Sequence, residues 1–268
     1  MTLGGECNPS TTDPNTSVYL YSGGPLLVKN DGGGLYTVNQ SMHESSNAAN
    51  ITFQRVHGFE DPAHLTGANY DGFYTGTVVN EDTTVAFERT IYAPTGNNAY
   101  MIVKTDYYSF SGAAIPGLII AEQIDWDIPT DRGSDNNSGL MANHGTVYYQ
   151  GVDTATVAPC QLNADRYGSM YFMGMHSAAD TADNACASTC EPFGVYAFEN
   201  DSLFAAPVDV DSLGQWYWDQ TIAKTGVSTS SVQGVDLHGV MTAVHDFTLD
   251  AGEVLTVYHA VSTVHEGT

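Results

Sequence analysis

A chain of 268 residues with 31 acidic but only 7 Lys and Arg side chains carries a formal net charge of −24. Nucleic acid and anionic membrane surfaces bind clustered cations, so this balance excludes both as expected partners. The sequence contains no apolar run of the length that spans a bilayer, and we therefore expect no membrane insertion. Low charge density with abundant Ser, Thr, Asn, Gly and Tyr is typical of exported β-proteins, which predicts a secreted or cell-surface location.

The N-terminal part of the chain is organised by turns. Gly, Pro, Asn and Asp recur in the first 34 residues, and residues 1–16 are predicted to form a turn-rich arm. Short stretches of strand-forming residues follow at 17–21, 26–29, 35–39 and 51–56. We expect short strands separated by polar loops.

Two long alternating stretches, residues 83–93 and 98–110, are joined by Pro94-Thr95-Gly96-Asn97. Pro suits the first corner of a turn, and Gly and Asn tolerate positive φ, so this segment predicts an antiparallel hairpin. Its alternation places Arg89 on the apolar face of the first strand.

A further alternating strand, residues 115–128, leads into a loop rich in carboxylates, amides and glycines that extends to residue 139. The period of two predicts a core face with Ile120, Glu122, Ile124, Trp126 and Ile128, and a polar, site-like face with Gln123, Asp125 and Asp127. Burying an isolated charge is costly. We therefore expect Arg89 and Glu122 to meet in a structural ion pair.

The loop after this strand is a candidate cation site, formed by Asp125, Asp127, Asp131 and Asp135. Calcium takes about six to eight oxygen ligands, which carboxylates and carbonyls of a bending loop can supply. Pro129 and Thr130 do not fit the loop of an EF-hand. The alternative is an acidic turn whose Asp and Asn side chains cap backbone amides.

Strands are also predicted at residues 145–151, 168–176 and 195–199, with a Cys-bearing surface loop at 177–193. Residues 211–223 are the one helical candidate. Asp211 or Ser212 can cap this helix, and its apolar side is predicted to consist of Leu213, Trp216, Tyr217 and Ile222.

Residues 240–249 and 253–264 flank the turn Asp250-Ala251-Gly252, which predicts a second hairpin. His245 and His259 fall on its apolar sides, nearly opposite each other. Core histidines with satisfied ring nitrogens are the favoured interpretation, and a two-histidine metal site is the alternative.

The cysteines number four: Cys7, Cys160, Cys186 and Cys190. An even number in a chain of extracellular composition predicts two disulfides. Cys186 with Cys190 and Cys7 with Cys160 is the favoured pairing, although Cys160 with Cys186 competes. A four-thiolate zinc site is the alternative, but only one pair is close in sequence.

The sequence has no Gly-x-Ser-x-Gly elbow, phosphate loop or dinucleotide fingerprint. A two-carboxylate glycosidase is conceivable, because carboxylates are numerous, but no spacing supports it. Four aromatic residues are candidates for stacking on sugar rings, although an aromatic-rich core explains them as well: Tyr70, Tyr74, Trp216 and Trp218.

The segment Gly117-Leu118-Ile119-Ile120-Ala121-Glu122-Gln123-Ile124-Asp125-Trp126-Asp127-Ile128-Pro129, with Asp131 and residues 135–139, resembles a recurring module of large exported bacterial proteins. Residues 87–94 and 166–170 resemble it too. The resemblance implies a secreted β-module upstream of an anchoring or sorting domain, and it adds no catalytic residue.

These observations predict an all-β, antiparallel β-sandwich with long loops and at most one short helix, in a single domain over residues 1–268. The favoured function is a non-enzymatic structural or adhesive module of a surface or filamentous assembly. It would associate with itself or with other extracellular proteins, and calcium is the candidate ion. The alternative is a carbohydrate-binding module or a domain of a polysaccharide-active enzyme.

Overall fold

A computed structural model describes residues 4–5, 17–18, 22–40, 54–55, 70–80, 82–95, 100–125, 136–141, 147–152, 166–177, 193–199, 209–223, 232–233 and 237–265. Apart from the helix α2 (Val210–Ala223), the regular elements in these ranges are β-strands. None of the helices described there is long and apolar enough to cross a membrane.

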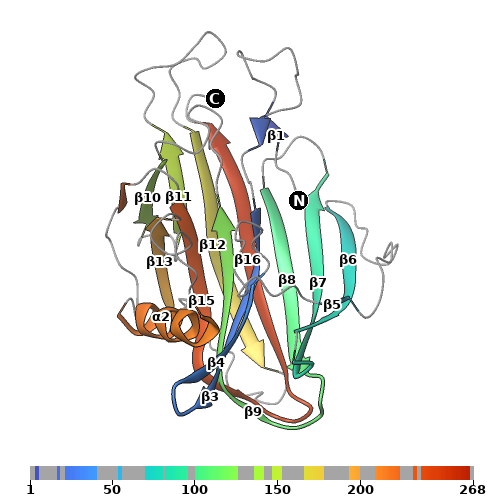
Figure 1. The fold of residues 1–268 in the computed structure, drawn as a ribbon. Coiled ribbons are helices and arrows are strands. Elements are labelled where there is room, and N and C mark those ends of the chain that lie inside the picture. Colours follow the sequence, from blue (N-terminus) through green and yellow to red (C-terminus); the bar gives the residue numbers. More distant parts are fainter. Residues whose placement is uncertain are drawn as a thin grey trace.

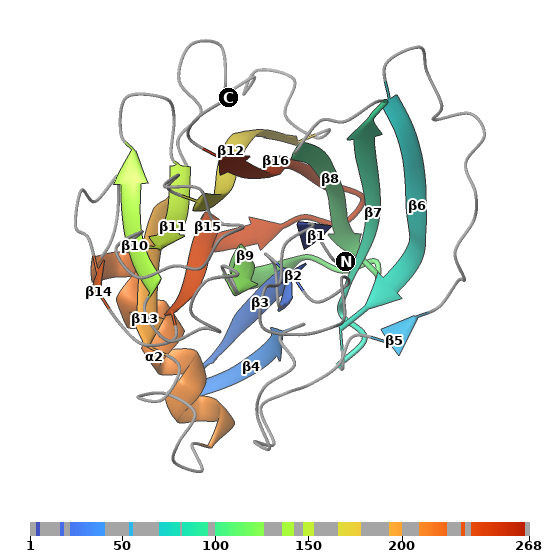
Figure 2. The same ribbon diagram turned by 90° about the horizontal axis from the view of Figure 1, so that it is seen from above.

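The strands form two facing antiparallel sheets, shown in Figure 1, and a small two-stranded pair of β1 (Gly4–Gly5) and β2 (Ser17–Val18). The larger sheet has nine strands, in the order β14 (Val232–Gln233), β10 (Asn136–Met141), β11 (Val147–Val152), β12 (Arg166–Ser177), β16 (Val254–His265), β8 (Tyr100–Ser109), β7 (Val85–Pro94), β6 (Tyr70–Val79) and β5 (Gln54–Arg55). The smaller sheet has five, in the order β13 (Gly194–Glu199), β15 (Leu237–Leu249), β9 (Ile115–Asp125), β3 (Ser22–Gly32) and β4 (Leu35–Gln40). Seen from above, the larger sheet curves around the smaller one (Figure 2). The predicted antiparallel sandwich is confirmed.

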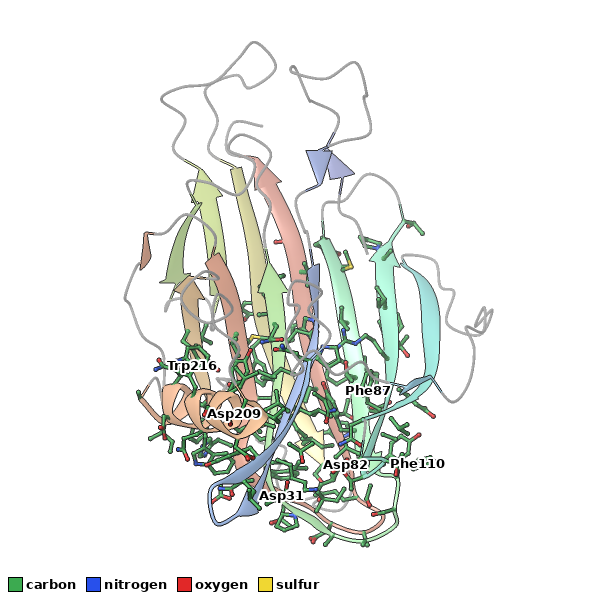
Figure 3. The ribbon with its side chains drawn as sticks, in the orientation of Figure 1. Asp31, Asp82, Phe87, Phe110, Asp209 and Trp216 are labelled. Atoms are coloured by element: carbon green, nitrogen blue, oxygen red, sulfur yellow. The ribbon has the colours of Figure 1, made fainter. Side chains whose placement is uncertain are left out.

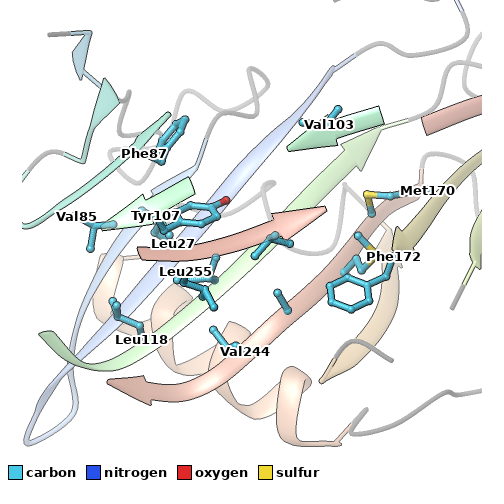
Figure 4. Packing of buried hydrophobic residues seen from close by; sticks show 14 of the residues in the cluster. Leu27, Val85, Phe87, Val103, Tyr107, Leu118, Met170, Phe172, Val244 and Leu255 are labelled. Carbon is cyan, nitrogen blue, oxygen red and sulfur yellow. The ribbon is translucent and has the colours of Figure 1, made fainter. Parts of the chain in front are cut away.

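The main core lies between the two sheets (Figure 4). Leu27 of β3 and Leu118 of β9 come from the five-stranded sheet, and Phe87, Tyr107 and Phe172 come from the nine-stranded sheet. Phe87 and Tyr107 lie on adjacent strands with their ring centroids 5.7 Å apart. Apolar residues at every second position thus close one face of each sheet against the other.

A second core lies on the outer face of the five-stranded sheet, where α2 covers it. Leu26 and Val28 of β3 point to this side, whereas Leu27 between them points into the main core. A sheet that is buried on both faces does not show a polar and apolar alternation, which explains the continuous apolar run at these positions.

The first predicted hairpin is confirmed. β7 and β8 pair antiparallel, with Phe87 opposite Tyr107 and Arg89 opposite Thr105. The alternation had been expected to place Glu88 beside Lys104, which in fact lies opposite Thr90. The turn residues and the apolar alternation of this segment both favour a hairpin, so the local sequence was sufficient to predict the pairing of β7 with β8.

The second predicted hairpin is wrong. β15 pairs with β13 and β9 in the five-stranded sheet, whereas β16 pairs with β12 and β8 in the nine-stranded sheet. The turn at residues 250–253 therefore crosses from one sheet to the other. Glu253 holds this crossing in place, because its carboxylate accepts hydrogen bonds from the Asp250 amide and the Ser177 hydroxyl. His245 and His259 consequently lie on different sheets.

Two further expectations need correction. Residues 136–139, expected to be loop, belong to strand β10, which pairs with β11 and β14. β6 was not expected either, because Gly72 and Gly76 interrupt its alternation.

Helix α2 confirms the predicted helix, but neither predicted cap is used. The carboxylate of Asp209 accepts bonds from the amide and hydroxyl of Ser212, at 2.9 and 2.8 Å, as an N-cap residue does. The predicted Asp211 instead accepts a bond from the backbone amide of Tyr36 in β4, at 2.7 Å. Ile222 does not share the buried side, since 48% of it is exposed.

Gly214 allows the closest approach of α2 to the sheet, because a Cβ at this position would lie 2.2 Å from the Tyr36 Cβ. We predict that Gly214→Ala lowers the free energy of unfolding by about 1–3 kcal/mol, although Ala favours helix formation by about 1 kcal/mol over Gly. Urea denaturation measures this loss. Gln220→Ala in the same helix is the control and should change stability little; an equally stable Gly214→Ala variant would contradict the close approach.

Candidate functional site

An ion pair links the two sheets inside the main core. Arg89 of β7 donates two hydrogen bonds to Glu122 of β9, from Nη1 to Oε1 at 3.0 Å and from Nη2 to Oε2 at 2.6 Å. The two side chains are only 12% and 11% exposed. The structure thus brings together the two charges that the sequence placed on apolar faces, in the bidentate geometry that suits guanidinium and carboxylate.

Polar neighbours on the nine-stranded sheet complete the site. The Arg89 Nε donates to the Thr105 hydroxyl at 3.2 Å, and the guanidinium carbon lies 5.9 Å from the centroid of the Phe87 ring. On β16, Nε2 of His259 lies 3.6 Å from Oε1 of Glu122. The Glu122 carboxylate of one sheet therefore meets side chains of β7 and β16 in the other, and β8 supports the arginine that binds it.

The protonation of His259 follows from its surroundings. Burial lowers its pKa to about 4; the Glu122 carboxylate opposes this shift and the Arg89 guanidinium reinforces it. Burial also raises the pKa of the Tyr107 phenol beside Arg89. At neutral pH the site therefore combines one cation, one anion and a neutral imidazole, with no net charge in the core.

This arrangement can neutralise and orient groups, but it is enclosed. His259 is 2% exposed and Thr105 is 1% exposed. A general acid or base must reach the proton that it transfers, either directly or through one water molecule. The geometry therefore favours a framework role, in which the ion pair fixes the relative position of the sheets.

Of the polar face that the sequence indicated on β9, the described side chain, Gln123, is also covered. Gln123 is fully buried beneath α2, and its amide group donates a 2.7 Å bond to the Tyr217 hydroxyl. That hydroxyl donates in turn to Oε1 of Gln40, at 2.9 Å. The sequence identified the polarity of Gln123 but did not reveal the helix that covers it.

Trp216 and Trp218 flank the buried Tyr217 and lie about 200° apart around the helix axis. Trp216 contacts the ring of Tyr196 on β13, with centroids 6.1 Å apart, and Trp218 contacts His245 on β15, at 4.3 Å. Both support the helix–sheet contact and do not share a stacking face. Figure 3 shows Trp216 on α2. The other candidates, Tyr70 and Tyr74, belong to β6 in the opposite sheet, and their side chains lie outside the description.

Several other predicted sites lie outside the described residues. Of the candidate calcium ligands, Asp125 is described only as the last residue of β9, and the rest are not described: Asp127, Asp131 and Asp135. The same holds for Cys7, Cys160, Cys186 and Cys190. Within the described ranges, no group of three or more His, Cys, Asp or Glu side chains is placed to hold a metal ion. The calcium site and the disulfides stay predictions.

A second charged contact between the sheets was not predicted. Nζ of Lys29 on β3 lies 2.8 Å from the carboxylate of Asp82, in the turn before β7, and 3.0 Å from that of Asp31. Figure 3 shows Asp31 and Asp82 near the same end of the sandwich. The sequence carried no signal for this contact, because Lys29 and Asp82 are far apart in the chain and each lies beside polar turn residues.

The comparisons with known proteins identify no relative. No protein-family model matches the chain, and no curated protein matches it significantly. The interpretation of the site therefore depends on its geometry.

The ion pair predicts strongly coupled substitutions. Glu122→Gln leaves the buried Arg89 charge uncompensated and should lower the free energy of unfolding by about 3–5 kcal/mol. The double variant Arg89→Met with Glu122→Leu removes both charges and should recover most of that loss. Urea denaturation of Arg89→Met, Glu122→Leu and the double variant measures the coupling; strictly additive losses would mean that the pair contributes no interaction energy.

His259 predicts a loss of stability on mild acidification. Its pKa is about 4 in the fold, below the ordinary histidine value of 6.5 that applies to the unfolded chain, so the unfolded chain binds the proton first. Stability should therefore fall as the pH drops from 6.5 to 4, by about 3 kcal/mol in total from this residue, and change no further below pH 4.

Denaturant unfolding between pH 7 and pH 4 checks this expectation. His259→Gln removes the titrating group, so the difference in stability between wild type and variant should shrink by the same amount over this window. If the difference in stability does not vary with pH, His259 is not the source of the loss of stability on acidification.

Proposed function

We propose that this chain is a non-enzymatic structural or adhesive module of an extracellular surface or filamentous assembly, and that it meets its neighbours through the outer face of the nine-stranded sheet. The composition supports an extracellular setting, because Lys and Arg are scarce and the chain is rich in residues with hydroxyl and amide side chains. The enclosed Arg89–Glu122 site supports a framework role and offers substrates no access.

The observation that carries this proposal is a row of apolar side chains across four strands of the larger sheet. Tyr92 lies opposite Ile102, Ile102 opposite Ala260, and Ala260 opposite Tyr171. Their sequence neighbours Ile91, Met101, Val103 and Val261 point into the main core, so alternation directs this row outward.

Exposed apolar residues extend the same face. Tyr100 on β8 is 37% exposed and Met173 on β12 is 40% exposed. By contrast, the inner faces of both sheets form the main core and the outer face of the smaller sheet is covered by α2. A contiguous apolar patch on a sheet face is a typical protein contact surface.

Charge sets a condition on this association. Two copies of a chain with a net charge of −24 repel each other at low ionic strength. Salt screens that repulsion, with a Debye length of about 10 Å at 0.1 M. Contact through an apolar face should therefore strengthen as salt is added.

The alternative function, glycan binding, has support on the same face. Burial lowers the pKa of Lys104, but its hydrogen bond to Asp106 and the nearby Tyr258 and Tyr92 together raise it by more, so the net shift is upward. The two tyrosines therefore lie close to the lysine. Aromatic rings beside hydrogen-bonding side chains are the groups that stack on and orient a sugar. If glycans bind here, the stacking residues are these tyrosines and not the tryptophans of α2.

Sedimentation velocity tests the proposed assembly. Wild-type protein should associate with increasing concentration and salt, and Ile102→Glu should shift it towards monomer by placing a charge in the centre of the row. Ile222→Glu is the matched control, since Ile222 is 48% exposed on α2. A chain that stays monomeric up to millimolar concentration, or an Ile102→Glu variant that associates as wild type does, would refute self-association through this face. Binding to immobilised glycans that is lost in Tyr258→Ala would favour the alternative.

A further inference from the structure

The interface between α2 and the five-stranded sheet encloses polar atoms that the protein itself does not pair. Four buried side-chain oxygens there have no hydrogen-bond partner: Gln123 Oε1, Tyr196 OH, Thr221 Oγ1 and Thr242 Oγ1. The four residues are at most 4% exposed. Buried polar groups of native proteins are almost always satisfied, so a cluster of such atoms requires an explanation.

The orientation of Gln123 follows from its neighbours. Its amide group donates to the Tyr217 hydroxyl, which has one proton and donates it to Gln40. Turning the amide over would place Oε1 against this hydroxyl, which has no second proton to donate. The carbonyl oxygen of Gln123 is therefore directed away from Tyr217 and still needs a donor.

The strand register gathers these oxygens around Val240 on β15. Gln123 of β9 lies opposite Val240 on one side, and Tyr196 of β13 lies opposite it on the other. Thr242 is two residues along β15 from Val240 and pairs with Ala121, so it shares the outer face. Thr242 is therefore a diagonal neighbour of both Gln123 and Tyr196, which flank Val240 from opposite sides.

Helix α2 closes the cluster from above. Thr221 lies one turn after Tyr217, on the buried side of the helix. Burial raises the pKa of the Tyr196 phenol, and a weak side-chain interaction with the Thr221 hydroxyl opposes this shift, but the two oxygens do not reach the geometry of a full hydrogen bond. The helix and three strands thus enclose one acceptor and three hydroxyl groups, each of which can both donate and accept.

We propose that this seam is a binding site for ordered water, sealed between α2 and strands β9, β13 and β15. A buried water molecule typically makes about three hydrogen bonds to otherwise unsatisfied groups. Water is the ligand that fits, because it can donate to Gln123 Oε1 and accept from or donate to the hydroxyls. A charged ligand does not fit, since the site contains no ionised group to compensate it.

An isosteric variant of the full chain tests the site. Thr242→Val keeps the shape and removes the hydroxyl. If the hydroxyl binds a buried water molecule, removing the hydroxyl leaves that water with one hydrogen bond fewer. The variant should then have a Tm lower by about 3 °C. Thr105→Val provides the scale, because the Thr105 hydroxyl makes a direct bond to Arg89. Thr221→Val repeats the test from the helix side.

Crystallography at about 1.5 Å resolution gives the direct readout. Ordered solvent within hydrogen-bonding distance of Gln123 Oε1 and at least one of the three hydroxyls is the expected result. A map without solvent there overturns the proposal. A Thr242→Val variant as stable as wild type, or more stable, also overturns it, because a hydroxyl without a partner is replaced at no cost.

Discussion

The Arg89–Glu122 ion pair constrains the relative position of the two sheets. Packing of apolar faces is tolerant of small displacements, whereas a bidentate pair inside the core has one favourable geometry. Because β7 and β9 lie on different sheets, the pair sets how one sheet is placed over the other. Such a buried pair adds little net stability compared with apolar residues, so its value lies in selecting one arrangement.

The five-stranded sheet occupies the middle of three layers, between the curved larger sheet and α2. Both its faces are buried, and each carries polar groups: Glu122 on the inner face and Gln123 on the outer face. Adjacent residues of one strand therefore connect two separate cores. This is why the central segment of β9 combines apolar and polar residues without presenting either to solvent.

Local chemistry predicted the parts of the fold that depend on neighbouring residues. Pro94 and Gly96 with long alternating flanks sufficed for the β7–β8 hairpin, and a charge on an apolar face sufficed to anticipate the partner of Arg89. The contact of His259 with Glu122 could not be predicted from the sequence, because it depends on which sheet β16 joins. Two strands beside a short turn have the same alternation whether they pair or separate. The buried side of α2 was misjudged because a close helix–sheet approach selects small residues such as Gly214 and Thr221, which apolar periodicity does not reveal.

The crossing at residues 250–253 determines the order in which the fold can be completed. β15 and β16 are interior strands of their sheets, each with a partner on both sides, and both come from the last part of the described chain. β9 and β13 remain unjoined until β15 is inserted, as do β8 and β12 until β16 arrives. During synthesis, each sheet therefore stays in two halves with open edges until these residues emerge. A nascent chain of this topology has these strand edges open until residues 237–265 have emerged.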